Sequence, residues 1–246
     1  RMERCDFLPV SAEEMHERGW WWYDALVVGG DAYVDHPSFG TAVISRVLEA
    51  EGLRVAVLAQ PDWHDAEAFR AMGRPRLGVF IGAGNLDSMV AHYTAAKRRR
   101  SEDFYSPGKR SGCRPDRAAI VYCNRAREAF GPDMPIILGS LEASLRRFAH
   151  YDYWDDSVRR AILFDAPADL LVYGMDEAAT IEIAHRLKKK QSVRTMTDIP
   201  GTGYITRDPS VCKFEHITLP SFEDVRDDKR LYAEATRTEY AEHDPI

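Results

Sequence analysis

Short apolar segments alternate with helix-like segments along most of the chain, and this alternation constrains the fold more than any other feature. The apolar segments have the length and near-continuous apolar character of strands that are buried on both faces of a sheet. Five of them are present, at residues 25–28, 54–59, 77–81, 136–138 and 169–173. Because strand–helix–strand units close with parallel strands, the alternation predicts an α/β fold with a doubly wound, five-stranded parallel sheet.

The expected strand order is 2-1-3-4-5, as in flavodoxin-like and cobalamin-binding-like Rossmann folds, which opens a ligand crevice between the first and third strands. Residues 25–190 form this predicted domain. Residues 1–24 precede it as a short helix and an aromatic cover segment that contains three consecutive tryptophans. Residues 191–246 are rich in turn residues and end in a charged helix, so we expect a linker and a connector helix that packs against a further domain.

Composition limits the classes of function. The chain has 246 residues and a net charge of −6, which argues against a dedicated, strongly basic nucleic-acid binder. It contains no apolar run of the roughly 20 residues that a membrane helix requires, and no signal-peptide pattern, so we expect a cytoplasmic protein without a membrane partner. Its four cysteines are far apart, and this spacing predicts no metal site in the chain.

Polar side chains follow three of the predicted strands. Because the carboxyl ends of parallel strands meet at one edge, we expect these side chains to form the rim of a ligand-facing or domain-facing pocket. The expected rim residues are Asp31, Tyr33, Asp35, His36, Ser38, Asn85, Asp87, Ser88, Glu142, Arg146, Arg147, His150, Tyr151 and Asp152. They form no obvious acid–base pair or metal cage, so we expect no catalytic residue in this chain.

The rim includes a dense mixture of charged and aromatic residues at positions 138–160. One interpretation is a helix that packs its aromatic side chains on the sheet and pairs its charges at the surface. The other, which we favour, is a docking and pocket-forming surface at the end of the fourth strand.

Two other sequence motifs give weaker evidence of function. A cobalamin-binding loop needs Asp-x-His-x-x-Gly, whereas here Asp35 directly precedes His36 and three residues separate His36 from Gly40, so we do not expect cobalamin. Residues 97–117 combine many basic residues with Phe104 and Tyr105, which is typical either of a solvated loop or of a segment that contacts RNA.

Several blocks of the sequence resemble the N-terminal region of the YgiQ-type radical SAM (S-adenosylmethionine) proteins. They are residues 30–40, 59–63, 83–90 and, most specifically, 142–156, which read E-A-S-L-R-R-F-A-H-Y-D-Y-W-D-D. The resemblance implies a degenerate cobalamin-binding-like domain followed by a radical SAM barrel, in which a Cys-x-x-x-Cys-x-x-Cys motif holds a [4Fe–4S] cluster that binds S-adenosylmethionine.

This chain has no such cysteine motif. The resemblance therefore implies an accessory domain, non-catalytic by itself, whose partner is the barrel of the same longer polypeptide and whose substrate is unknown. Two alternatives remain open: a stand-alone module that binds a nucleotide or a corrinoid, and a module that contacts RNA.

Overall fold

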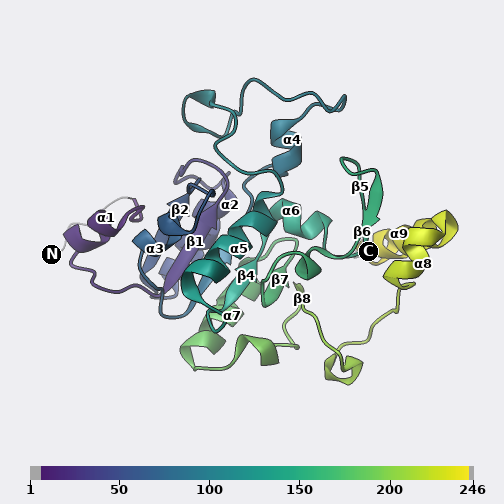
Figure 1. Ribbon diagram of the computed structural model, residues 1–246. Helices are drawn as coiled ribbons and strands as arrows, with labels where there is room; N and C mark the ends of the chain where they lie inside the picture. The colour runs from purple at the N-terminus through teal and green to yellow at the C-terminus, as the bar shows by residue number, and fades with distance from the viewer. Residues whose placement is uncertain (1–6, 244–246) are drawn as a thin grey trace.

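The computed structural model describes residues 7–243, which are organised around one mostly parallel sheet (Figure 1). The sheet has the order β2-β1-β3-β4-β7-β8. The first five strands in this list pair in parallel. Their bounds are β1 (Ala25–Gly29), β2 (Val55–Ala59), β3 (Gly78–Ile81), β4 (Ile136–Leu138) and β7 (Leu170–Val172). The predicted doubly wound sheet and its 2-1-3-4-5 order are confirmed.

The predicted number of strands is wrong, because the sheet has six strands within residues 7–243. The sixth strand, β8 (Thr202–Gly203), comes from the segment predicted to be a linker, and it pairs antiparallel with β7. Its pairing occupies backbone groups of β7 that would otherwise form an open sheet edge. A strand of two residues is too short to produce an alternating pattern in the sequence.

Helices cover both faces of the sheet, and each face has its own apolar core. On one face, α2 (Gly40–Ala50) and α7 (Glu177–Lys188) lie side by side over a core that includes Val27 and Phe80. On the other face, α3 (Glu67–Ala71) and α5 (Ala118–Phe130) pack over a core that includes Leu26. Burial of the strands on both faces explains their nearly continuous apolar sequence.

Two helix starts differ from the sequence-based expectation. Because Ser38 is a good capping residue just before a helix-like segment, the sequence predicts that Ser38 caps α2. In the structure Phe39 occupies the cap position, and the side-chain Oδ1 of Asn85 accepts the N–H of Gly40 instead. Asp62, another good capping residue, predicts a short helix that runs from there to Met72. Its carboxylate accepts the N–H of His64, which stabilises a turn, and α3 begins only at Glu67.

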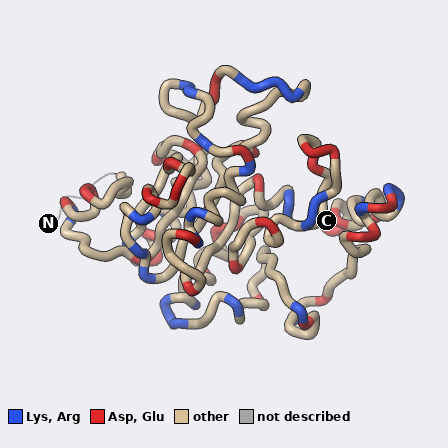
Figure 2. The backbone as a smooth tube through the Cα atoms, viewed as in Figure 1, with Lys and Arg blue, Asp and Glu red and all other residues tan. Residues whose placement is uncertain are grey.

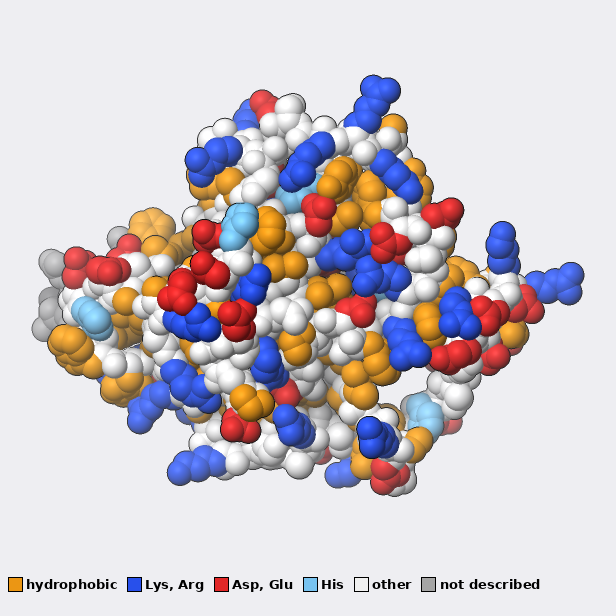
Figure 3. Space-filling model, viewed as in Figure 1, with side chains coloured by type: hydrophobic (Ala, Val, Ile, Leu, Met, Phe, Trp, Pro, Cys, Tyr) orange, Lys and Arg blue, Asp and Glu red, His pale blue; other side chains and the backbone are white. Residues whose placement is uncertain are grey.

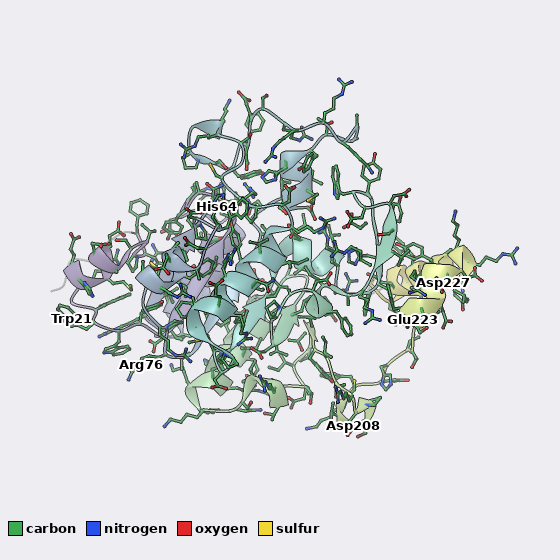
Figure 4. The ribbon with its side chains drawn as sticks, viewed as in Figure 1. Trp21, His64, Arg76, Asp208, Glu223 and Asp227 are labelled. Atoms are coloured by element: carbon green, nitrogen blue, oxygen red, sulfur yellow. The ribbon has the colours of Figure 1, made fainter. Side chains whose placement is uncertain are left out.

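At the N-terminal side, the expected short helix is present as α1 (Ala12–Glu17). The spacing of Ser11 and Glu14 predicts its cap, and the hydroxyl of Ser11 does accept the N–H of Glu14. The aromatic segment that follows places the Trp22 ring between two guanidinium groups, with the Arg54 and Arg76 carbons 3.9 and 4.1 Å from the ring centroid. In Figure 4, Trp21 and Arg76 lie at the opposite end of the molecule from Glu223 and Asp227.

The segment at positions 138–160 is not one helix. It forms α6 (Ser140–Leu145) and then an antiparallel hairpin of β5 (His150–Asp152) and β6 (Ser157–Arg159). The helical interpretation is therefore wrong beyond Leu145. The turn is held by Asp152, whose carboxylate accepts the N–H groups of Trp154 and Asp155.

The C-terminal part packs against this hairpin (Figure 1). The spacing of Ser221 and Asp224 predicts a capping box, which is present. The expected single charged helix is divided into α8 (Phe222–Asp227) and α9 (Lys229–His243) by the extended residue Asp228. The other helical segments are α4 (Ser88–His92) and four 3-10 turns, Pro107–Lys109, Ile162–Phe164, Val193–Thr195 and Pro209–Val211. Among residues 7–243, every helix is too short or too polar to cross a membrane.

Candidate functional site

A pocket of about 470 Å³ opens at the carboxyl ends of β1, β3, β4 and β7. Its floor is made by apolar strand residues such as Val28, Ile81 and Ile137, and α2, α6 and α7 supply its walls. This is where a doubly wound sheet is expected to place a ligand. The volume falls within the range of roughly 300–1,000 Å³ that is common for small-molecule sites.

Gly139 and Gly84 leave space for charged side chains beside the pocket. A Cβ atom at Gly139 would come within 2.9 Å of the Asp176 carboxylate, which lies over the end of β4. Gly84 has φ +109, and a Cβ atom there would lie 2.3 Å from the Asp31 carboxylate and 2.8 Å from the Arg114 guanidinium. Both positions therefore favour glycine, because a side chain would displace charged groups beside the pocket.

Of the residues predicted to form the rim, Asn85 and Arg147 line the pocket. The Asn85 side chain accepts from Gly40 N–H and donates to the carbonyl of Ser38, so it ties two loops together at the pocket edge. The Arg147 guanidinium donates to the carbonyl of Ser144, pairs with Glu239 of α9 at 2.7 Å and lies over the Tyr173 ring.

The predicted residues of the first loop are held in contacts within the protein. Asp31 is buried, contacts Arg114 at 2.8 Å and accepts the N–H of Asn85. Burial raises the pKa of Asp31, and the positive charge of Arg114 opposes that rise. Asp35 forms an ion pair with Arg46.

The remaining members of that loop are arranged locally. His36 is exposed, and its Nδ1 accepts the N–H of Ser38. Tyr33 is partly buried against the core between the sheet and α2 and α7.

A second group of predicted residues joins α4, α5 and α6. The buried Glu142 carboxylate accepts the N–H of Ser88 at 2.9 Å and the N–H of Ala119 at 3.1 Å. Burial raises the pKa of Glu142, and the nearby negative charge of Asp87 raises it further. Asp87 caps α4 by accepting the N–H of Met89, and it also pairs with Arg146. This group therefore holds three helix ends together beside the pocket.

The hairpin residues lie further from the pocket. The Asp152 carboxylate is 3.1 Å from Arg117. Burial acts to raise the pKa of Asp152, but the N–H of Asp155 and the Arg117 guanidinium outweigh burial and lower the pKa.

The two other predicted hairpin residues bind neighbouring segments. The backbone N–H of Tyr151 donates to the Tyr232 hydroxyl of α9 at 3.0 Å. His150 contacts the carbonyl of Phe148, and burial lowers the pKa of the imidazole. A second cavity of about 350 Å³ lies between this region and α8 and α9.

Asp176 and Thr180, at the start of α7, are polar pocket residues that the predicted rim does not include. Burial raises the pKa of Asp176, and the neighbouring charge of Glu177 raises it further. The same rule that selected the other rim residues would have found Asp176, because it follows the fifth parallel strand. Ser140 follows the fourth strand, as the predicted rim residues of that loop do. It lines the pocket with a left-handed backbone, φ 74, and its Oγ accepts the N–H of Ala83.

The basic loop after α4 lies beside the hairpin turn, which is rich in acidic residues (Figure 2). Lys97 donates to the carbonyl of Trp154 at 3.3 Å and lies over the Tyr153 ring. Arg100 donates to the carbonyls of Val90 and Tyr93. Some of the basic groups are therefore engaged within the protein, although others project from the top of the molecule in Figure 3. RNA contact stays a prediction.

The residues do not fit an iron–sulfur cluster. Cys123 is buried inside α5, Cys113 and Cys212 belong to separate loops, and Cys5 lies outside the described residues. Across the described positions 7–243, no three His, Cys, Asp or Glu side chains gather as metal ligands would. No step of any reaction is therefore assigned to a cluster in this chain, and the absence of cobalamin stays a prediction.

Comparison with known proteins decides the family. The sequence model of the radical SAM N-terminal family matches residues 7–246. The chain belongs to this family. Curated relatives in it include a UPF0313 protein from Clostridium botulinum (strain 657 / Type Ba4), 54% identical over the whole of this chain, and one from Clostridium perfringens (strain SM101 / Type A), 52% identical.

The radical SAM N-terminal chain spans only 38% and 37% of the lengths of these two relatives. Two solved structures of the radical S-adenosylmethionine methyltransferase TsrM from Kitasatospora setae are also similar. They are 20% and 19% identical, with a TM-score of 0.48, over 74% of this chain and 28% and 27% of theirs. One was solved with tryptophan and a SAM analogue, and the other with cobalamin and a [4Fe–4S] cluster.

Proposed function

We propose that this radical SAM N-terminal domain is the accessory domain of a radical SAM enzyme and forms part of its substrate pocket. The observation that carries the proposal is the apolar pocket at the strand ends together with the exposed apolar side chains at its mouth. Leu141 and Leu145 line the pocket and are 45% and 58% exposed, and Met175, next to the pocket residue Gly174, is 90% exposed.

Apolar side chains that rim an open pocket are typical of surfaces that a ligand or another domain covers. The longer relatives have more than half of their length outside the region matched by this chain. We infer that a barrel in the same polypeptide closes over the pocket and covers these side chains. That barrel would supply the iron–sulfur cluster and S-adenosylmethionine.

Contacts between the pocket region and the C-terminal helix α9 support a defined position of the barrel relative to the pocket. Arg147, at the pocket, pairs with Glu239 of α9, and the Tyr232 hydroxyl of α9 accepts the N–H of Tyr151 in the hairpin. These contacts hold α9 beside the pocket. In the proposed enzyme, this domain binds and orients substrate and excludes water, whereas the barrel performs the radical chemistry.

Amide hydrogen exchange tests whether the barrel docks over the pocket. Amide exchange is measured for residues 140–145 and 173–176 in this 246-residue chain and in a longer polypeptide of the family that includes the matching region. We expect strong protection of both segments in the longer polypeptide alone. The Trp22 segment, at the other end of the molecule, serves as the control and should exchange equally in both. Equal exchange of residues 140–145 in the two proteins would contradict the proposal.

Reconstitution of an iron–sulfur cluster tests whether the cluster belongs to the proposed barrel rather than to this chain. Incubation of the 246-residue chain with iron and sulfide should give no absorption band near 400 nm that is attributable to a bound cluster. The chain should also fail to cleave S-adenosylmethionine. A stoichiometric [4Fe–4S] signal from this chain alone would overturn the division of roles.

A further inference from the structure

The pocket has a distinctive charge arrangement. Of the described residues that line it, two are charged, Arg147 and Asp176, and only Arg147 has a partner of opposite charge. Its guanidinium is occupied by Glu239 and the Ser144 carbonyl and lies over the Tyr173 ring. Arg147 is therefore engaged within the protein, whereas Asp176 is available to a ligand.

Asp176 lies at the N-terminal end of α7, where the helix dipole favours a negative charge. Its carboxylate lies against Gly139 at the end of β4, on the wall of the pocket. The charged group that acts most strongly on it is Glu177, of like sign, and within residues 7–243 no Lys or Arg forms an ion pair with it. Thr180, one turn later on α7, also lines the pocket and is buried.

The surroundings of Asp176 discriminate between classes of ligand. An anionic group in this apolar pocket would meet a carboxylate of like charge. A wholly apolar group would remove water from the carboxylate without replacing its hydrogen bonds, which is unfavourable. A protonated amine attached to an apolar group would bury its apolar part against Val28, Ile81 and Ile137 and pair its charge with the carboxylate.

We propose that this pocket selects an apolar ligand that carries a protonated amine, and that Asp176 is the residue that pairs with the amine. The inference rests on the proposed function, since it names the class of substrate that the pocket would admit. It concerns a part of the pocket that this chain completes by itself, so it can be tested without the barrel.

Three small probes with the same ring test the selection. They are 1-naphthylmethylamine, 1-naphthalenemethanol and 1-naphthoate, which are cationic, neutral and anionic at pH 7.5. Binding to the 246-residue chain is measured by protein-observed NMR, which also locates each probe. We expect the amine to bind at least about tenfold more tightly than the alcohol or the carboxylate, with shifts at residues 174–180 and 139–145.

Asp176→Asn should reduce the preference for the amine to less than about twofold, while binding of the alcohol is retained. Glu177→Gln is the matched control, because Glu177 adjoins Asp176 but does not line the pocket, and it should keep the full preference. A second measurement needs no variant. Binding of the amine and of the alcohol is compared across pH, and the preference for the amine should fall at acid pH as Asp176 becomes protonated.

The proposal is overturned if the amine binds no more tightly than the alcohol, or if its preference survives in Asp176→Asn. Either result would leave the docking proposal standing, because docking is judged by exchange at the pocket mouth. Conversely, equal exchange in the short and long polypeptides would remove the docking proposal but not the amine preference.

Discussion

The guanidinium of Arg114 lies 2.8 Å from the carboxylate of Asp31, and both side chains are buried. Asp103 contacts the same guanidinium at 2.9 Å, and the group also donates to the carbonyl of Ala83. One arginine of the long loop after α4 thus fixes that loop to the first strand end and to the loop after β3. This arrangement makes the loop part of the domain beside the pocket.

Arg114→Met should destabilise the protein by about 3–5 kcal/mol, because it leaves Asp31 and Asp103 buried without their cation. Urea unfolding, monitored by tryptophan fluorescence, measures the change. Arg110→Met is the control: Arg110 belongs to the same loop but is exposed, and we expect a change within about 0.5 kcal/mol. A loss below about 1 kcal/mol for Arg114→Met would show that the buried ion pairs do not hold the loop.

Glu142→Gln should lower the free energy of unfolding by about 1–3 kcal/mol. Both carboxylate oxygens accept backbone N–H groups, from Ser88 and Ala119, so an amide would place an NH₂ donor against one of them. Removal of a buried charge offsets part of this loss. Thermal unfolding measures the net loss of stability. Glu234→Gln is the control, because Glu234 is exposed and its replacement should change the melting temperature little. An unchanged melting temperature would argue against the dual contact of Glu142.

Asp176→Asn should stabilise the chain at neutral pH. Burial raises the pKa of this carboxyl, so its ionised form is disfavoured in the folded protein, and stability is lost as pH rises from the unfolded pKa through the folded pKa. Below the unfolded pKa, both proteins carry an uncharged side chain and the difference should vanish. Melting temperatures of the two proteins across the acid range measure this, and a difference that does not change with pH would contradict it.

The cysteines should differ in reactivity. Cys123 is fully buried in α5, and burial raises the pKa of its thiol, so little reactive thiolate forms. Cys113 and Cys212 are partly exposed and should react faster with a chromogenic disulfide. Mass spectrometry of the labelled protein should find Cys123 unmodified until denaturant is added. Rapid labelling of Cys123 in the folded protein would indicate local opening of α5.

The sequence alone determined the parallel sheet. Buried strands such as Ile136–Leu138 must be apolar along their whole length, and the helices between them must show apolar residues at helical spacing, so both patterns are local and readable. The caps of α1 and α8 are predictable from the sequence because they too are local. The hydroxyls of Ser11 and Ser221 each accept the N–H of a residue three positions later.

Only the tertiary structure decided which polar residues face the pocket. Asp31 and Glu142 follow strands as a ligand-binding residue would, yet the structure surrounds them with Arg114 and with the N–H groups of distant helices. Asp176 keeps an uncommitted carboxylate because no cation is folded against it within the described chain. Partners far away in the sequence decide whether a charge is used for stability or left for a ligand, and no local pattern of residues records them.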